Sequence, residues 1–417
     1  MKTAIVLGGT VPHVELVNQL KGRGYYTILV DYLDNPPAAS VADEHIQEST
    51  LDQEKVLEIA LERKADLVIC GCVDQANITA CYVMEKLGKK PPYSYDLAKK
   101  ITNKGYMKKV MMENAIPTSR YYYIDDDSDV ADIVLDYPVI VKPADCNSSK
   151  GVRKANDPAQ MKEYLKDAIL ASRNKRAIVE EFVEGVEFSA YCFVHNKKAV
   201  LFNTNERLSV QDGEKKVIKC YASILPARIP EWATKRAEEI ATRIAEVFEL
   251  DNTPLFFQGI VKNGEVYVIE FAPRVAGGVS FSTILDSTGF DQVSAVIDSY
   301  LGIVPDMTHF DPKFSLVVNS VYGNDGIFDH AENYESLIED GTIEHIYFHK
   351  KGGAVIDNST ATASRVCVFI VKAEDLISGV DKIQKVYDNL RLINVEGKNM
   401  IRKELSIPVQ LKNEIKK

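Results

Sequence analysis

The stretch at 266–278 has the composition of a buried strand that runs into a charged, glycine-ended loop. Its first four residues are β-branched or aromatic, as in strands that pack inside a core. Glu270 follows them near the end of the strand, where packing alone would favour an apolar side chain. Because a carboxylate offers the hard oxygen ligands that divalent metals prefer, Glu270 is a candidate metal ligand.

Three further residues make this loop a candidate edge of an active site. Arg274 carries a planar guanidinium that suits a carboxylate or a phosphate. Gly277 and Gly278 let backbone N–H groups approach a ligand closely. From this stretch alone, the alternative is a salt bridge between Arg274 and Glu270 that closes a strand at a glycine turn.

The composition restricts the class of protein. A chain of 417 residues, of which 46% are hydrophobic, can form two or three domains with real cores. Its 50 basic and 60 acidic residues give a net charge of −10, which disfavours nucleic acid and anionic membranes as partners. The amino terminus does not read as a signal peptide and no apolar run approaches a membrane span, so a cytoplasmic location is expected.

The opening of the chain shows a βαβ pattern. Residues 2–7 and 27–30 have the composition of strands, and an apolar helical stripe lies between them. Asp31 then follows a glycine turn by about 20 residues, a spacing typical of NAD-binding proteins. The turn at 8–13 lacks the third glycine of that fingerprint, however, so the pattern indicates a Rossmann-like half-fold without an NAD site.

Two lysine-containing segments are candidates for phosphate binding. The first is predicted to be one helix that carries five lysines, Lys104 among them; such a run is usually a solvated face, but one of its lysines can reach a phosphate. In the second, Lys142 lies near the end of a short apolar strand in the stretch 137–143, and a small, polar loop follows at 144–152. Backbone amides and hydroxyls in such a loop can wrap a phosphate, although the Walker pattern is absent.

An acidic segment at 180–187 suits a nucleotide. Backbone groups near Phe182 and Val183 can contact the edge of an adenine, and the carboxylate of Glu187 can accept two ribose hydroxyls. A charged, solvated hairpin is the alternative.

A hairpin is predicted farther along the chain. Asn263-Gly264 is a strong turn signal between a strand at 256–261 and the strand that carries Glu270. Gln258 and Glu270 then fall on paired strands, which can bring their side-chain oxygens together.

The remaining segments carry weaker signals. Asp74 follows a buried strand at the end where open α/β sheets bind ligands, so it can contact substrate or simply cap the next helix. Lys219 lies beside a lysine-rich loop and can contact substrate or be solvated charge. A helix is expected at about 374–390, and the basic tail after Arg402 is expected to be ordinary surface.

Taken in order, these motifs resemble those of the ATP-grasp superfamily. The resemblance covers about residues 95–305, and the segment before it is similar to the pre-ATP-grasp domain of purine-pathway carboxylate-amine ligases and of biotin carboxylase. It implies an α/β fold that is α+β in part. The expected domains are a Rossmann-like pre-ATP-grasp domain at 1–95, an ATP-grasp domain of two α+β subdomains at 96–305, and a small C-terminal α+β domain at 306–417.

The resemblance also implies roles for single residues. Lys104 and Lys142 would contact the phosphates of ATP, and Arg274 would hold the substrate carboxylate, with Lys142, Gly277 and Gly278 completing the catalytic group. The remaining contacts to the nucleotide would come from the phosphate loop and the adenine hinge, namely Ser148, Ser149, Gly151, Glu180, Glu181, Phe182, Val183 and Glu187.

The resemblance further makes Glu270 a ligand for Mg²⁺, with Mn²⁺ as a substitute. Gln258 stands where relatives usually carry an acid, and Ala272 stands where an asparagine is common. One oxygen ligand is therefore missing, and the number of ions, one or two, is open.

The implied reaction joins a small-molecule carboxylate to an amine. The carboxylate attacks the γ-phosphate of ATP to give an acyl phosphate and ADP, and the amine then captures the acyl group. The first alternative is a purine-pathway or carboxylase-type enzyme that uses carboxyphosphate or a ribotide. The second is a non-catalytic, ATP-binding regulatory protein. A homodimer is compatible with the resemblance.

Overall fold

The chain forms two compact units in the computed structural model. The structure describes residues 2–125, 130, 133–146, 151–213 and 217–410. One unit consists of Met1–Phe202 with Ile229–His309, and the other of Asn203–Arg228 with Phe310–Lys417. Helices and strands are both abundant, which confirms the expected α/β class. The division into domains at 1–95, 96–305 and 306–417 stays a prediction.

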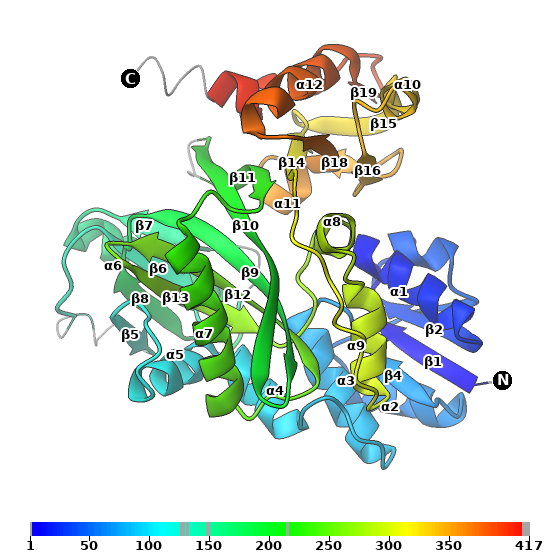
Figure 1. Cartoon of the computed structure of the whole chain (residues 1–417), viewed down its shortest axis with the longest axis vertical. Helices are drawn as coiled ribbons and strands as arrows, with labels where there is room; N and C mark the ends of the chain where they lie inside the picture. Colours follow the sequence, from blue (N-terminus) through cyan, green and yellow to red (C-terminus); the bar gives the residue numbers. More distant parts are fainter. Residues whose placement is uncertain (1, 126–129, 131–132, 147–150, 214–216, 411–417) are drawn as a thin grey trace. The chain divides into compact units, whose positions relative to one another are not determined.

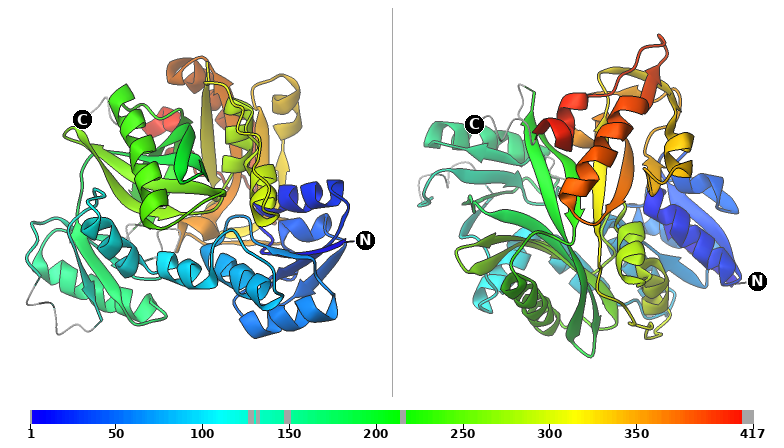
Figure 2. Two further views of the ribbon diagram at one scale, coloured as in Figure 1. Left: turned by 60° about the horizontal axis from the view of Figure 1, so that its bottom comes forward. Right: turned by 45° about the horizontal axis from the view of Figure 1, so that its top comes forward.

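The first unit begins with a four-stranded parallel sheet in the order β3-β2-β1-β4. Figures 1 and 2 show helices on both of its faces, and the central strands β1 and β2 carry runs of buried apolar residues because they are covered on both sides. Asp31 Oδ2 accepts a hydrogen bond from Gly9 N at 2.7 Å, so this acid holds the glycine turn in place. The elements are β1 (Lys2–Leu7), α1 (Val11–Gly22), β2 (Tyr25–Asp31), η1 (Pro37–Ser40), β3 (Glu44–Gln47), α2 (Gln53–Glu62), β4 (Leu67–Ile69) and α3 (Asp74–Lys86).

Two helices follow where the lysine-rich pattern predicted one. α4 (Tyr95–Thr102) ends and α5 (Lys104–Glu113) begins at Asn103, whose backbone is extended. The side chain of Asn103 accepts a hydrogen bond from Tyr106 N at 3.0 Å. The prediction of one helix was wrong because this side chain caps a new helix at its N-terminus.

The next layer is an antiparallel sheet in the order β5-β8-β6-β7. Helix α6 covers it, and apolar residues of both form one core. Lys142 and Glu180 lie on the neighbouring strands β6 and β8. The elements are β5 (Tyr121–Ile124), β6 (Val139–Pro143), β7 (Arg153–Ala155), α6 (Pro158–Ala171) and β8 (Ala177–Glu181).

A second antiparallel group in this unit contains β9, β12 and β13. The hairpin between β12 and β13 turns at Asn263 and Gly264, both at positive φ, as Asn-Gly predicts. Gln258 pairs directly with Glu270 after a register shift between Gln258 and Gly259, so the two residues lie on paired strands as predicted. The elements are β9 (Val186–His195), α7 (Glu231–Val247), β12 (Thr253–Lys262), β13 (Glu265–Ala272), α8 (Ser280–Thr288) and α9 (Gln292–Tyr300).

The other unit is built on antiparallel strands in the order β10-β11-β14-β18-β16, with β10 entering it from the first unit. The helix expected at 374–390 is α12. Leu405 and Ile407 are buried in the core, so the prediction of an ordinary surface tail after Arg402 was wrong at these positions. The elements are β10 (Lys198–Asp212), β11 (Val217–Leu225), β14 (Ser315–Tyr322), β15 (Gly326–Glu332), α10 (Tyr334–Glu339), β16 (His345–Phe348), β17 (Val355–Ile356), α11 (Ala361–Ser364), β18 (Arg365–Ala373), α12 (Leu376–Asn389), β19 (Arg391–Asn394) and η3 (Lys403–Leu405).

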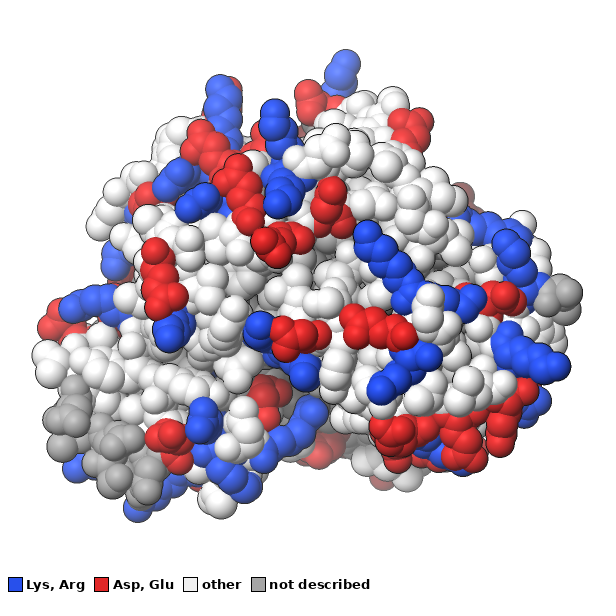
Figure 3. Space-filling view, turned by 90° about the horizontal axis from the view of Figure 1, so that it is seen from below, with Lys and Arg blue, Asp and Glu red and all other residues white. Residues whose placement is uncertain are grey.

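The surface carries mixed charge. On the face shown in Figure 3, acidic and basic side chains are interspersed, and the described residues form no broad basic patch there. Among the described residues, no helix is both long and apolar enough to span a bilayer.

Candidate active site

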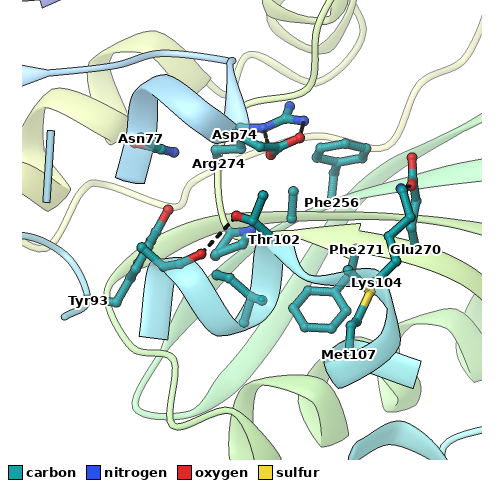
Figure 4. Close-up of a pocket in the computed structure, with 14 residues that line it drawn as sticks. Asp74, Asn77, Tyr93, Thr102, Lys104, Met107, Phe256, Glu270, Phe271 and Arg274 are labelled. Atoms are coloured by element: carbon teal, nitrogen blue, oxygen red, sulfur yellow. Dashed lines mark hydrogen bonds and ion pairs between the residues drawn. The ribbon is translucent and has the colours of Figure 1, made fainter. Parts of the chain in front are cut away.

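A pocket in the first unit collects several of the predicted residues (Figure 4). It encloses about 490 Å³ of space, part of which is open to solvent. Its walls come from the start of α3, from α4 and α5, and from the ends of β12 and β13 with the loop that follows. The residues that line it include Asp74, Lys104, Glu270 and Arg274. The structure thus brings Glu270 and Arg274, from the stretch at 266–278, together with Lys104, one of the two candidate phosphate lysines.

Lys104 and Glu270 form an ion pair in this pocket. Lys104 is the first residue of α5, and the cap at Asn103 therefore fixes where its side chain starts. Burial alone would raise the pKa of Glu270, but the ammonium of Lys104, helped by Lys142 and Arg274, lowers it to about 2. Glu270 is therefore a charged carboxylate at neutral pH, as a metal ligand must be.

Lys142 lies in a second, deeper cluster. Its ammonium pairs with Oε1 of Glu180, and Lys108 Nζ lies 2.7 Å from Oε2 of the same carboxylate. All three side chains are nearly fully buried. Burial opposes the charge of Glu180, but Lys108 and Lys142 outweigh it and hold the pKa of Glu180 well below its usual range. The cluster is a buried carboxylate shared by two lysines.

Sequence reasoning missed Lys108. It treated the lysines of this segment as a solvated face, whereas Lys108 is only 1% exposed. The available signal was spacing: Lys108 lies four residues after Lys104, so both side chains fall on the same face of α5. Lys100 and Lys109 are exposed, as the lysine run predicted, and they pair with Asp96 and Glu113.

Arg274 is held by Asp74 from the first residue of α3. Arg274 Nη2 donates to Asp74 Oδ2 at 2.7 Å, Nε donates to Oδ1, and Nη1 donates to the carbonyl of Val275 at 3.0 Å. Burial disfavours the charge, but Asp74 raises the pKa of Arg274. The alternative role of Asp74 as a helix cap was wrong, because Val73 is the N-cap residue of α3. The salt bridge between Arg274 and Glu270 is not the one formed: Lys104 pairs with Glu270 instead.

The hinge segment also has defined contacts. Arg120 Nε donates to Glu181 Oε1 at 2.6 Å, and Phe182 N donates to the carbonyl of Pro138 at 3.3 Å. The ammonium of Lys154 lies 3.6 Å from the centre of the Phe182 ring. Glu187 pairs with Ile260 of β12, which places the candidate ribose contact beside the strand of Gln258. The role of the hinge in binding adenine stays a prediction.

The other predicted residues fall in several places. Ser148 and Ser149 lie outside the described residues. Gly151 has a φ of +73°, and a Cβ there would lie 2.8 Å from Pro143 Cγ, so the position requires glycine. Gly278 has a φ of +71° just before α8 begins, whereas a Cβ on Gly277 would meet nothing within 4 Å.

Lys219 belongs to the other unit. It is 0% exposed, and its ammonium lies 2.8 Å from Asp212 Oδ2. Arg402 donates to both oxygens of the same carboxylate, at 2.6 and 2.8 Å. The interpretation of Lys219 as solvated charge was therefore wrong, and its role in substrate binding stays a prediction.

The donors around Glu270 fit one Mg²⁺ ion together with phosphate oxygens. Gln258, the paired residue on β12, adds an amide oxygen on the same face, and Ala272 adds none. Among the described residues, no three His, Cys, Asp or Glu side chains are grouped to hold a metal alone. Mg²⁺ commonly binds through one or two carboxylates plus substrate phosphates and water, which this donor set allows.

Known proteins share sequence and fold with this chain. The family described as the ATP-grasp domain matches residues 135–283. The formate-dependent phosphoribosylglycinamide formyltransferase of Ignicoccus hospitalis is 29% identical over 283 residues, which cover 65% of this chain and 69% of that protein. The D-alanine–D-alanine ligase of Thermosipho africanus is 28% identical over 210 residues, or 47% of this chain and 55% of that protein.

Solved structures share the fold over almost the whole chain. The phosphoribosylglycinamide synthetase of Anaerococcus prevotii has a TM-score of 0.74 at 19% identity and covers 94% of this chain and 99% of its own. The L-amino acid ligase of Bacillus licheniformis has a TM-score of 0.76 at 16% identity, with 94% and 99% covered.

Residues 135–283 thus form an ATP-grasp domain. The chain is an ATP-dependent ligase of the kind that forms C–N bonds, with sequence similarity to purine-pathway enzymes and a fold shared with biotin carboxylase.

Proposed function

We propose that this protein uses ATP and Mg²⁺ to activate a small carboxylate as an acyl phosphate, which an amine then captures. The observation that carries the proposal is the pocket of the first unit, where Lys104, Glu270 and Arg274 line one cavity and Lys142 is close enough to lower the pKa of Glu270. The site thus combines lysines that can bind phosphate, a carboxylate that can bind a metal and a guanidinium that can bind a carboxylate.

The lysines would bind the phosphates. Each is paired with a carboxylate, Lys104 with Glu270 and Lys142 with Glu180, so the charge of each buried ammonium is compensated. Binding a polyanion would exchange these partners. Glu270 and Gln258 would hold the metal ion, which supplies charge neutralisation on the transferring phosphoryl group.

Arg274 would orient the carboxylate for attack. A carboxylate oxygen forms a bond to the γ-phosphorus while the bond to the bridging oxygen of ADP breaks, and the cations stabilise the charge that gathers between the two anions. The amine nitrogen then attacks the acyl carbon, loses a proton, and phosphate leaves. Apolar walls at Phe256 and Phe271 would limit the access of water to the acyl phosphate.

The identity of the substrates is a separate question. The carboxylate-amine reaction leads our proposal, and the relatives suggest a second candidate: the activation of formate, with phosphoribosylglycinamide as the amine. The similarity to that formyltransferase, which extends over 65% of this chain, supports this second candidate. A bicarbonate-dependent reaction through carboxyphosphate is the third candidate, since biotin carboxylase shares the fold.

The test is release of ADP from ATP and Mg²⁺ with paired substrates. Amino acid pairs, formate with phosphoribosylglycinamide, and bicarbonate with aminoimidazole ribotide are compared with each single component. The proposal expects ADP release that depends on both a carboxylate and an amine, and transfer of a heavy-oxygen label from the carboxylate to inorganic phosphate. ATP binding without turnover in any pair would instead support a regulatory protein. A homodimer stays a prediction, for which sedimentation at several concentrations is the measurement.

A further inference from the structure

Lys108 is a buried cation with no place in the reaction described above. It lies one helical turn after Lys104 on α5 and is 1% exposed. A buried ammonium loses its hydration, so it persists only where its hydrogen bonds are replaced and its charge is compensated. The contacts that compensate Lys108 also connect it, through Glu180, to Lys142, one of the candidate phosphate lysines.

The ammonium of Lys108 is fully satisfied. Its Nζ lies 2.7 Å from Glu180 Oε2 and donates to the hydroxyls of Thr118 and Ser119 at 2.8 and 2.9 Å. An ammonium has three donors, and all three have acceptors. Ser119 in turn donates to the same Oε2 of Glu180 at 2.9 Å. Lys108 and Ser119 therefore fix one oxygen of this carboxylate.

Lys142 is bound differently. Among the contacts of the described residues, its ammonium meets only the other oxygen of Glu180. Its ammonium thus has donors left for a further acceptor, whereas that of Lys108 has none. Of the two lysines on Glu180, Lys108 is the fixed partner and Lys142 is the exchangeable one.

We propose that Lys108 is a positioning residue that keeps Glu180 compensated, so that Lys142 can leave this carboxylate for the phosphates of a bound nucleotide. The inference rests on the proposed nucleotide site. Without Lys108, Lys142 would be the only cation on a buried carboxylate, and its move to a phosphate would leave Glu180 charged and unpaired. Lys142 would then be retained by Glu180, and nucleotide binding would weaken.

The charge of Lys108 also gives the proposal a pH signature. Burial lowers the pKa of Lys108, and the charge of Glu180 on β8 opposes this effect. The positive charges of Lys142 on β6 and Lys104 on α5 lower the pKa further, and it lies at about 8. The Tyr121 ring on β5 lies 5.5 Å from its Nζ. The protonated fraction of Lys108 therefore falls as pH rises through about 8, whereas an arginine at this position would stay charged.

The test compares the affinity for ATP with Mg²⁺, by calorimetry, in Lys108→Met, Lys108→Arg and Lys109→Met. Lys109 is the adjacent residue on the same helix, is exposed, and serves as the matched control. We expect Lys108→Met to raise the Kd and the KM for ATP by about 10-fold or more with a smaller change in kcat, while Lys108→Arg stays within about 3-fold of the parent. Between pH 7 and pH 9, the affinity of the parent should fall and that of Lys108→Arg should not.

A double-mutant cycle separates this role from general damage to the fold. Once Glu180→Gln has removed the shared charge, Lys108→Met should have little further effect on affinity. An unchanged Kd in Lys108→Met, or the same loss in both backgrounds, would overturn the inference while leaving the proposed function intact. A parent protein that binds no ATP would overturn both.

Discussion

Asp74 and Arg274 lie 200 positions apart in the sequence and form a bidentate ion pair, with Nη2 and Oδ2 separated by 2.7 Å. The pair joins the start of α3 to the loop after β13, and both side chains line the pocket. A planar guanidinium that already binds one carboxylate in this geometry is held ready for a second. Asp74 therefore sets the direction of the fork that we assign to substrate.

Arg274→Ala should abolish turnover and spare ATP binding. The guanidinium would orient the carboxylate and stabilise charge during phosphoryl transfer, and the loss of one such donor commonly lowers kcat by about 10²- to 10³-fold. The measurement is ADP release together with calorimetric titration of ATP. Arg274→Lys, which keeps the charge but not the fork, should recover little activity. Near-normal rates in Arg274→Ala would remove this residue from the site.

Gln258→Glu should lower the Mg²⁺ concentration required for half-maximal activity, by about 10-fold, because a second carboxylate would face Glu270 across the β12–β13 pair. Glu270→Gln should raise the same concentration. Both are read from Mg²⁺ titrations at fixed ATP. Lys235→Gln on the exposed face of α7 changes the net charge by the same amount as Gln258→Glu and is the control. An unchanged titration curve for Gln258→Glu would place the metal elsewhere.

Asp212 gives a prediction about stability in the other unit. The guanidinium of Arg402, with Lys219, lowers the pKa of Asp212 to about 2, from 3.8. Since the folded pKa lies below the unfolded one, this carboxylate contributes stability above about pH 4 and loses it as pH falls towards 2. Asp212→Asn should cost about 2 kcal/mol at pH 7, because the fully buried Lys219 loses its counter-charge.

Urea unfolding at several pH values checks this prediction. The free energy of unfolding of the parent should fall more steeply between pH 4 and pH 2 than that of Asp212→Asn. Asp251→Asn, at an exposed turn before β12, removes the same charge and is the control. Parallel pH curves for the parent and Asp212→Asn would contradict the assignment.

Local patterns were sufficient for the strands and for one part of the site. Asn263-Gly264 fixes a two-residue hairpin, so the pairing from Lys262 with Glu265 out to Gly259 with Val268 follows from the count of residues on either side. The same count would place Gln258 opposite Ile269, and only a register shift between Gln258 and Gly259 brings Gln258 opposite Glu270. The strand that carries Lys142 and the helix α12 were also predicted, because periodicity and turn residues depend on the local sequence of each segment.

The partner of each charge could not be predicted in the same way. Tertiary packing between distant elements determines that Asp74 pairs with Arg274 and that Lys108 pairs with Glu180. A run of lysines favours a solvated face, and it is the contacts of Lys108 with Glu180, Thr118 and Ser119 that bury it. The sequence shows which charged residues are present, but only the fold determines which of them form ion pairs.

Asn103→Ala tests whether the break between α4 and α5 serves the site. The loss of this N-cap should cost about 1 kcal/mol of stability, because the first-turn N–H of Tyr106 loses its acceptor. It should also raise the KM for ATP, because α5 begins at Lys104 and a frayed first turn no longer fixes that side chain. Ser94→Ala removes the matching cap of α4, which accepts from Leu97 N at 3.2 Å. We expect a similar loss of stability in Ser94→Ala without the change in KM, and equal KM values in the two variants would show that the cap acts on stability alone.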